Sequence, residues 1–228
     1  MNIELEITLE CNAGCSQCSR HCNIFDYGPS EMSTEQVNRF IRQVKERQKT
    51  LDILSIMGGE PTVHPKMEEI TLLLFNQLKL KGYVNKLRIA TNGINPIPDS
   101  IKNLPIEIIT SPPAKKEHRC QFIAPKDIKQ KMCFCEVPYT CGIALNYFGY
   151  FPCGAGGAIT RLFKLTHLIR YELPDSVEDF GDFEVLCKLC QKSALKPVML
   201  RDHNPDPSVS FQKAIKNYEK AKPSYRSF

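Results

Sequence analysis

Three cysteines in one short loop, directly after an apolar run, constrain the fold of this chain more than any other feature. Cys11, Cys15 and Cys18 follow the run at residues 3–9, which predicts a buried strand. Three thiolates at this spacing can bind three irons of a cubane cluster and leave the fourth iron open for chemistry. Zinc loops are built differently, because they usually pair two-cysteine knuckles. The loop therefore indicates an iron–sulfur site at the mouth of a strand.

Polar or glycine-rich motifs end the next three apolar runs, at residues 53–57, 87–90 and 106–110. The residues concerned are Gly58, Gly59, Glu60, Thr91, Asn92 and Ser111. Each motif alone is compatible with an ordinary turn. Since the carboxyl ends of successive parallel strands meet on one face, the motifs in register with the cysteine loop favour a shared ligand site. Paired glycines there would let the backbone approach a ligand closely.

Together, the loop and these motifs resemble the radical S-adenosylmethionine (SAM) enzymes over roughly the first half of the chain. The resemblance implies that Cys11, Cys15 and Cys18 hold a [4Fe–4S] cluster whose open iron chelates the amino and carboxylate groups of SAM. One electron then splits SAM into methionine and a 5′-deoxyadenosyl radical, which abstracts hydrogen from the substrate. It also implies two groups of SAM contacts. Gly58, Gly59 and Glu60 would receive the methionine amino group, and Thr91, Asn92 and Ser111 would lie near the methionyl and ribose portions.

The periodicity predicts an α/β fold with alternating strands and helices, hence a parallel sheet. Residues 33–36 form a capping-box sequence at the start of a helix. Further helices are expected at 65–81 and near 99–103. His64 is expected to cap the helix at 65–81 or to pack near its start. A C-terminal helix begins near Asp206 and Pro207 and places Phe211, Ala214, Ile215 and Tyr218 on one face. The resemblance implies a βα barrel. Because only about four βα units can be traced, we expect this barrel to be shortened, at residues 1–137; alternatively, the runs at 119–123 and 132–137 supply irregular last strands.

A second cysteine group predicts a cysteine-rich hairpin and helix extension at residues 138–228. Cys141 and Cys153 lie at the two ends of a hairpin pattern, and Cys187 and Cys190 follow in a helical-looking stretch that starts near Asp175. Four thiolates can hold either zinc or an iron–sulfur cluster. The arrangement resembles the Twitch extension, which implies one auxiliary [4Fe–4S] cluster. Four cysteines stay unassigned: Cys22, Cys120, Cys133 and Cys135. The default interpretation of Cys133 and Cys135 is a small buried apolar side chain.

Composition is compatible with one sizeable core in a reducing compartment. The chain has 228 residues, of which 42% are hydrophobic, and its eleven cysteines come without an export signal or a membrane-length apolar run. We therefore expect a cytoplasmic protein with no membrane partner and no nucleic-acid partner. The net charge of +5 comes largely from residues 115–131 and 213–226. It indicates a solvated basic face, with attraction to an acidic substrate as the weaker alternative.

Three functions follow from these observations. The first is a radical SAM enzyme of oxidoreductase or lyase type that oxidises or rearranges a small molecule, such as a sugar, cyclitol or nucleotide, with an electron donor such as flavodoxin or ferredoxin. The second is the same chemistry on a peptide or protein, which ranks lower because no leader-binding domain precedes the predicted barrel. The third is a non-enzymatic zinc-binding interaction module. It ranks last because three cysteines leave a zinc site incomplete.

Overall fold

The computed structural model describes residues 1–13, 18, 20, 22, 28, 30–110, 135–190, 209–221 and 225–228. The side chains of 209–211 are outside this description. Several residues discussed above therefore lie outside the described part of the chain: Cys15, Ser111, Cys120, Cys133 and the side chain of Phe211. The strand runs expected at 119–123 and at 132–134 lie outside it as well.

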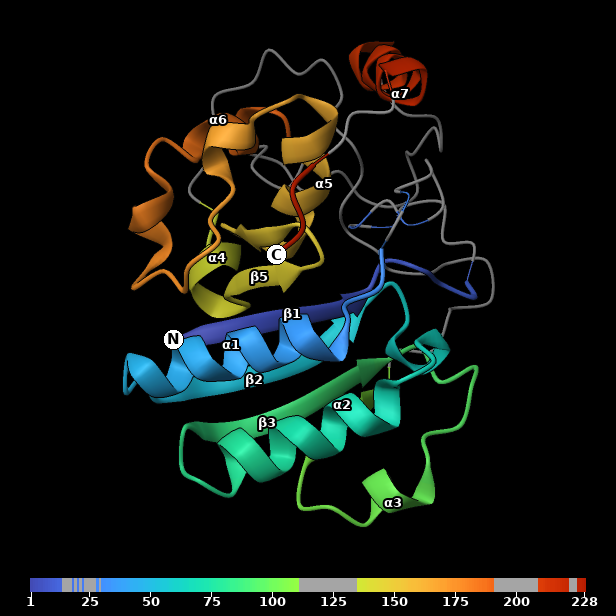
Figure 1. The fold of residues 1–228 in the computed structure, drawn as a ribbon. Coiled ribbons are helices and arrows are strands. Elements are labelled where there is room, and N and C mark those ends of the chain that lie inside the picture. Colours follow the sequence, from blue (N-terminus) through green and yellow to red (C-terminus); the bar gives the residue numbers. More distant parts are fainter. Residues whose placement is uncertain are drawn as a thin grey trace.

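A six-stranded sheet forms the centre of the molecule (Figure 1). Its strands are β1 (Asn2–Thr8), β2 (Leu51–Gly58), β3 (Val84–Thr91), β4 (Glu107–Thr110), β5 (Ile143–Asn146) and β6 (Gly149–Phe151). The spatial order is β4-β3-β2-β1-β5-β6, and every neighbouring pair is parallel except the antiparallel hairpin β5–β6. The first four strands fall on the four predicted apolar runs, which confirms the α/β class with a parallel sheet.

The expected hairpin of the cysteine-rich segment is confirmed, and it continues the sheet. Strand β5 pairs with β1 on the side that β2 does not occupy, with Leu5 opposite Leu145. Before it, α4 (Val137–Thr140) is helical, so this described end of the 132–137 run forms no strand. The domain boundary expected after residue 137 stays a prediction.

Helices α1 (Thr34–Glu46) and α2 (Met67–Leu74) lie against one face of the sheet (Figure 1). The capping box of α1 is confirmed, because Ser33 and Gln36 each accept a hydrogen bond from the main-chain N–H of the other. Alternate residues of β1, such as Ile3 and Leu5, join the apolar face of α1 in one core. The intervening residues therefore point to the opposite face.

The other helical segments connect or cover these elements. They are η1 (Pro61–Val63), the π-helical η2 (Phe75–Lys79), α3 (Asp99–Lys102), α5 (Gly154–Leu162), η3 (Thr166–Leu168), η4 (Val177–Phe180), α6 (Glu184–Lys188) and α7 (Val209–Ala221). The helical stretch expected to start near Asp175 consists of two separate segments, η4 and α6. The helical conformation ends at Gly181, whose φ of 69° terminates η4 before α6 begins.

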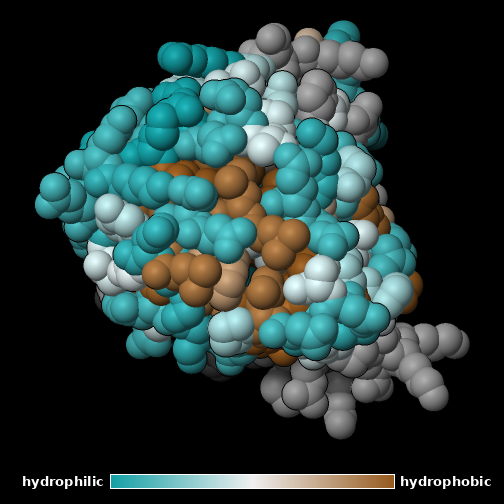
Figure 2. Space-filling view, turned by 60° about the horizontal axis from the view of Figure 1, so that its bottom comes forward, coloured by the Kyte–Doolittle hydropathy of each residue, from teal (hydrophilic) through white to brown (hydrophobic). Residues whose placement is uncertain are grey.

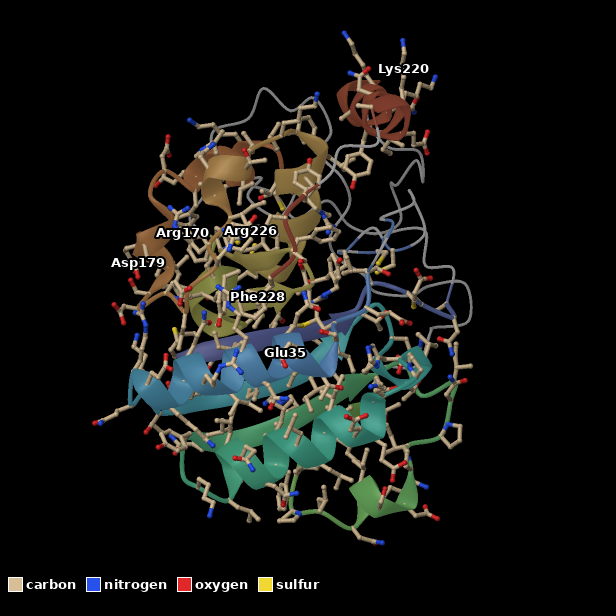
Figure 3. All side chains as sticks on the ribbon, viewed as in Figure 1. Glu35, Arg170, Asp179, Lys220, Arg226 and Phe228 are labelled. Carbon is tan, nitrogen blue, oxygen red and sulfur yellow. The ribbon has the colours of Figure 1, made fainter. Side chains whose placement is uncertain are left out.

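Helix α7 docks as expected, because Ala214, Ile215 and Tyr218 are all buried. The segment after it packs against the hairpin. Phe228 donates its N–H to the carbonyl of Tyr147 at 2.7 Å, and Figure 3 shows its ring above α1. Phe228 thereby joins the main core with β1 and α1, whereas α5 and the hairpin share a second core.

The described surface mixes hydrophilic and apolar residues. On the face that comes forward in Figure 2, apolar side chains gather among hydrophilic ones. Leu80, Ile94 and Tyr139 are the exposed large hydrophobic residues of the described part. In the same part, no helix combines the length and the hydrophobicity needed to cross a membrane.

Candidate active site

The two glycines after β2 allow its end to lie directly against the chain that enters the cysteine loop. A Cβ atom on Gly58 would lie 2.0 Å from the carbonyl oxygen of Thr8, and one on Gly59 would lie 2.1 Å from that of Glu10. In return, the N–H of Gly59 donates to Thr8 and the N–H of Glu60 donates to Glu10, both at 2.8 Å. The close approach predicted from the paired glycines is thus made to the backbone after β1. A contact of these glycines with SAM stays a prediction.

Glu60 joins the ends of two strands, and it is 1% exposed. Its Oε1 accepts hydrogen bonds from the hydroxyl groups of Thr62 and Thr91, both at 2.7 Å, and from the N–H of Thr62 at 3.1 Å. Its Oε2 accepts from the main-chain N–H of Asn92 at 2.6 Å. The carboxylate is therefore occupied by donors of this chain and holds the turn after β3 beside the turn after β2.

Asn92 reaches from the end of β3 to the cysteine loop. Its Nδ2 donates to Asn12 Oδ1 at 2.8 Å and lies 4.0 Å from Cys11 Sγ. Its Oδ1 accepts from the N–H of Ile94, which fixes the orientation of the amide. The structure thus gathers six described residues of the predicted site at the carboxyl ends of β1, β2 and β3: Cys11, Gly58, Gly59, Glu60, Thr91 and Asn92.

The described thiols of the cysteine loop have unlike environments. Burial raises the pKa of Cys11. A hydrogen bond from the Cys22 thiol lowers the pKa of Cys18 to about 6, although burial opposes this shift. Cys22, which the spacing argument left unassigned, therefore lies beside the third cysteine of the motif. A thiolate is the form of cysteine that binds metal.

His64 has the structural role that was expected of it. The imidazole is 5% exposed, its Nε2 lies 3.0 Å from the carbonyl oxygen of Met32, and its Nδ1 accepts the N–H of Lys66 at 3.0 Å. This pattern requires the proton on Nε2. Burial lowers the pKa of His64, which keeps the ring neutral. The residue thus secures the start of α2 to the segment before α1.

The second group of cysteines lines a cavity that is partly open to solvent. Its thiol-bearing lining residues are Cys135, Cys153, Cys187 and Cys190, and the remaining lining is apolar. Three of these were predicted. The fourth predicted member, Cys141, is exposed and does not line the cavity.

Cys135 is the residue that sequence reasoning missed. The hairpin pattern favoured Cys141, because Cys141 and Cys153 lie at the two ends of the hairpin sequence. In the structure α4 separates the two candidates, and Cys135 precedes this helix on the side of the cavity. A cysteine before a short helix carries no local signal that distinguishes it from a buried apolar residue.

Burial and neighbouring thiols raise the pKa values of two of the cavity thiols, Cys153 and Cys187. Burial, followed by the neighbouring Cys190 and Cys187, raises the pKa of Cys153 well above its ordinary value. Burial and the neighbouring Cys135 raise the pKa of Cys187 to about 12. A bound metal centre would compensate the charge of such thiolates. Among the described residues, no three His, Cys, Asp or Glu side chains converge on a point suited to one metal ion. Four thiols around one space could hold either a zinc ion or an iron–sulfur cluster.

The model of the radical SAM superfamily matches residues 5–111 of this chain. The chain is 32% identical to the 7-carboxy-7-deazaguanine synthase of Haemophilus influenzae over 168 residues, which cover 70% of each protein. It is 30% identical to a probable GTP 3′,8-cyclase of Pyrococcus horikoshii over 92 residues, or 40% of this chain and 26% of the cyclase.

Two solved structures share the fold at low sequence identity. BtrN in complex with AdoMet and 2-DOIA aligns with a TM-score of 0.50 and 13% identity, over 84% of this chain and 87% of BtrN. BtrN in an open conformation aligns with a TM-score of 0.50 and 13% identity, over 89% of this chain and 91% of that chain. These likenesses agree with a partial barrel.

Proposed function

Because this chain belongs to the radical SAM superfamily, we propose that it is an enzyme that reductively cleaves SAM and abstracts hydrogen from a small-molecule substrate. Cys11, Cys15 and Cys18 would hold the [4Fe–4S] cluster. The observation that carries this proposal is the convergence of Cys11, Glu60 and Asn92 at the carboxyl ends of three neighbouring parallel strands. When bound, the cluster supplies the single electron that splits SAM into methionine and the 5′-deoxyadenosyl radical.

The residues of the chain would hold SAM mainly through the main chain. Both oxygens of the Glu60 carboxylate already accept hydrogen bonds from residues of this chain. We therefore expect the main chain of residues 58–60, and not this carboxylate, to receive the methionine amino group. Thr91, Asn92 and Ser111 would lie near the methionyl and ribose portions. Since Glu60 and Asn12 already orient Asn92, little rearrangement would be needed when SAM binds.

A small, nucleotide-like or cyclitol-like substrate fits the relatives best. The two relatives are named as a deazaguanine synthase and a GTP cyclase, and the BtrN structure holds 2-DOIA. Their names favour a small-molecule substrate over a peptide and an enzyme over a zinc-binding interaction module. An oxidation or a rearrangement of such a molecule is the reaction we propose, with flavodoxin or ferredoxin as the source of the electron.

The second cysteine group would hold an auxiliary [4Fe–4S] cluster. Four thiols line one mostly apolar cavity, and this is the donor set that such clusters use. We assign Cys135, Cys153, Cys187 and Cys190 as its ligands, in place of the set with Cys141 expected from the sequence. When bound, this cluster would accept an electron or bind substrate.

The test of SAM cleavage is anaerobic. The protein is reconstituted with iron and sulfide, reduced with dithionite and supplied with SAM, and 5′-deoxyadenosine is quantified. Product from the wild-type protein and its loss in Cys15→Ala would support the proposal, with Cys141→Ala as the control for loss of an exposed thiol. A cluster-loaded protein that forms no 5′-deoxyadenosine with any nucleotide or cyclitol of a substrate panel would contradict it.

A further inference from the structure

A buried ion cluster lies between the two groups of cysteines. Arg20 belongs to the cysteine loop, and its Nε donates to Glu6 Oε1 at 2.6 Å while its Nη2 donates to Glu4 Oε2 at 3.0 Å. Both carboxylates belong to β1 and point away from α1. The side chains of Arg20 and Glu4 are 13% exposed, and that of Glu6 is 1% exposed. Because these charges are largely withdrawn from water, each depends on its partners.

The same cluster contacts the start of the cysteine-rich segment. Glu6 Oε2 accepts a hydrogen bond from Asn146 Nδ2 at 2.8 Å, at the end of β5. Glu4 accepts a hydrogen bond from the main-chain N–H of Gly154, the first residue of α5. A Cβ atom on Gly154 would lie 2.7 Å from both Arg20 Nη2 and Glu4 Oε2. A larger residue at position 154 would therefore have to displace the ends of the Arg20 and Glu4 side chains.

The covalent connections from this cluster to the thiols are short. Arg20 is two residues from Cys18 and two from Cys22, and Gly154 is bonded to Cys153, which lines the cavity. A displacement of the loop would separate Arg20 from two buried carboxylates. A displacement of α5 would remove Gly154 and Asn146 from the same carboxylates. Neither group of cysteines can therefore move far without disturbing the contacts of the other.

We propose that Arg20 is a positioning residue that fixes the cysteine loop against the start of α5 and thereby couples the two cysteine sites. The catalytic meaning of this coupling rests on the proposed function, whereas the coupling itself is a property of the folded chain. It is reciprocal, since a perturbation at either end acts through the same buried charges.

The first test measures alkylation of each cysteine by iodoacetamide in the iron-free protein, resolved by mass spectrometry. Arg20→Met should raise the alkylation rate of Cys153 on the order of a hundredfold, because it leaves two buried carboxylates without their cation. Arg20→Lys should restore much of the protection. The matched control is Arg88→Met, which breaks the 2.8 Å pair with Glu107 on the same face of the sheet and should change the rate by less than about twofold.

The reciprocal test perturbs the other end of the contact. Gly154→Ala should raise the alkylation rate of Cys22 in the cysteine loop. Gly156→Ala is the matched control on the same helix, because its Cβ would meet Leu186 and Cys153 instead of the ion cluster. Gly156→Ala should change the rate at Cys22 less than Gly154→Ala does, because its Cβ does not meet Arg20 or Glu4.

Amide hydrogen exchange in β2 and β3 shows whether each variant is folded, and protection there should match that of the wild type. If Arg20→Met does not fold, Glu6→Gln replaces it, with a smaller rise at Cys153 expected. An unchanged Cys153 rate in a folded Arg20→Met or Glu6→Gln variant would overturn the coupling. The alkylation measurement needs neither iron nor SAM. If the wild-type protein does not cleave SAM but the alkylation rates change as expected, the proposed function is contradicted and the coupling is not.

Discussion

The Glu60 carboxylate accepts a 2.6 Å hydrogen bond from the main-chain N–H of Asn92, which joins the end of β2 to the end of β3. Through this contact the amide of Asn92 is held beside the cysteine loop. Glu60 therefore holds the backbone of Asn92 in place, and both of its carboxylate oxygens already accept hydrogen bonds. The two turns are held together because both oxygens of the Glu60 carboxylate accept hydrogen bonds.

Glu60→Gln should destabilise the protein. The substituted amide keeps one acceptor oxygen but presents an NH₂ group to a donor, so we expect the free energy of unfolding to fall by about 2 kcal/mol. Urea denaturation of the iron-free protein measures this change. Glu35→Gln is the control, because Glu35 is exposed on α1 (Figure 3) and should change the stability by less than about 0.5 kcal/mol. Equal stability of the two variants would show that the Glu60 network contributes little.

Gly59→Ala should disrupt the site through the backbone. Its Cβ would lie 2.1 Å from the carbonyl oxygen of Glu10, so the cysteine loop has to move away from β2. We expect a loss of stability of about 3 kcal/mol and a fall in SAM cleavage on the order of a hundredfold. Gly157→Ala serves as the control, since its Cβ comes no closer than 3.3 Å to any neighbour. Normal 5′-deoxyadenosine formation by Gly59→Ala would contradict the argument.

Cys135→Ser and Cys141→Ser distinguish the two candidate ligands of the second site. Loss of a ligand should lower the iron content by up to about four atoms per chain in Cys135→Ser, because a cubane needs all of its thiolates. Cys141→Ser should retain the wild-type iron content, since Cys141 is exposed and outside the cavity. Iron and zinc analysis after reconstitution provides the measurement. The reverse result would restore the ligand set expected from the sequence.

His64 should make the stability depend on pH. Burial lowers its pKa in the folded state below the ordinary value of about 6.5, so the unfolded chain binds the proton first as the pH falls. The stabilising contribution of the neutral ring is therefore complete above pH ~6.5 and is lost progressively below it. A protonated Nδ1 could also no longer accept the N–H of Lys66.

Urea denaturation of the wild type and of His64→Gln at pH 8 and pH 5.5 would reveal this contribution. The wild type should lose more stability between the two pH values than the variant, which has no titrating group at position 64. Parallel losses in the two proteins would assign the pH dependence to other residues.

The local patterns of the chain were enough to predict its first four strands, the capped helix α1, the hairpin and the docked face of α7. These features depend on the period of apolar residues and on capping or turn residues close in sequence, so they can be recognised without a partner. The meeting of Cys11, Glu60 and Asn92 was predictable for a related reason. Parallel strands place their carboxyl ends on one side, whatever the details of packing. The predicted positions of Cys15 and Ser111 lie outside the described residues.

Only the tertiary structure decided which side chains of distant segments meet. The choice of Cys135 over Cys141 depends on how α4 turns the chain before β5, and a spacing of cysteines does not encode this turn. The contacts of Arg20 with Glu4 and Glu6, and of these carboxylates with Asn146 and Gly154, require β5 to lie beside β1. Such contacts arise from strand order and side-chain direction, which are settled when the whole core packs. The sequence alone therefore determined the chemistry available to this protein, and the packing of β5 and α5 against β1 decided how its two cysteine sites are joined.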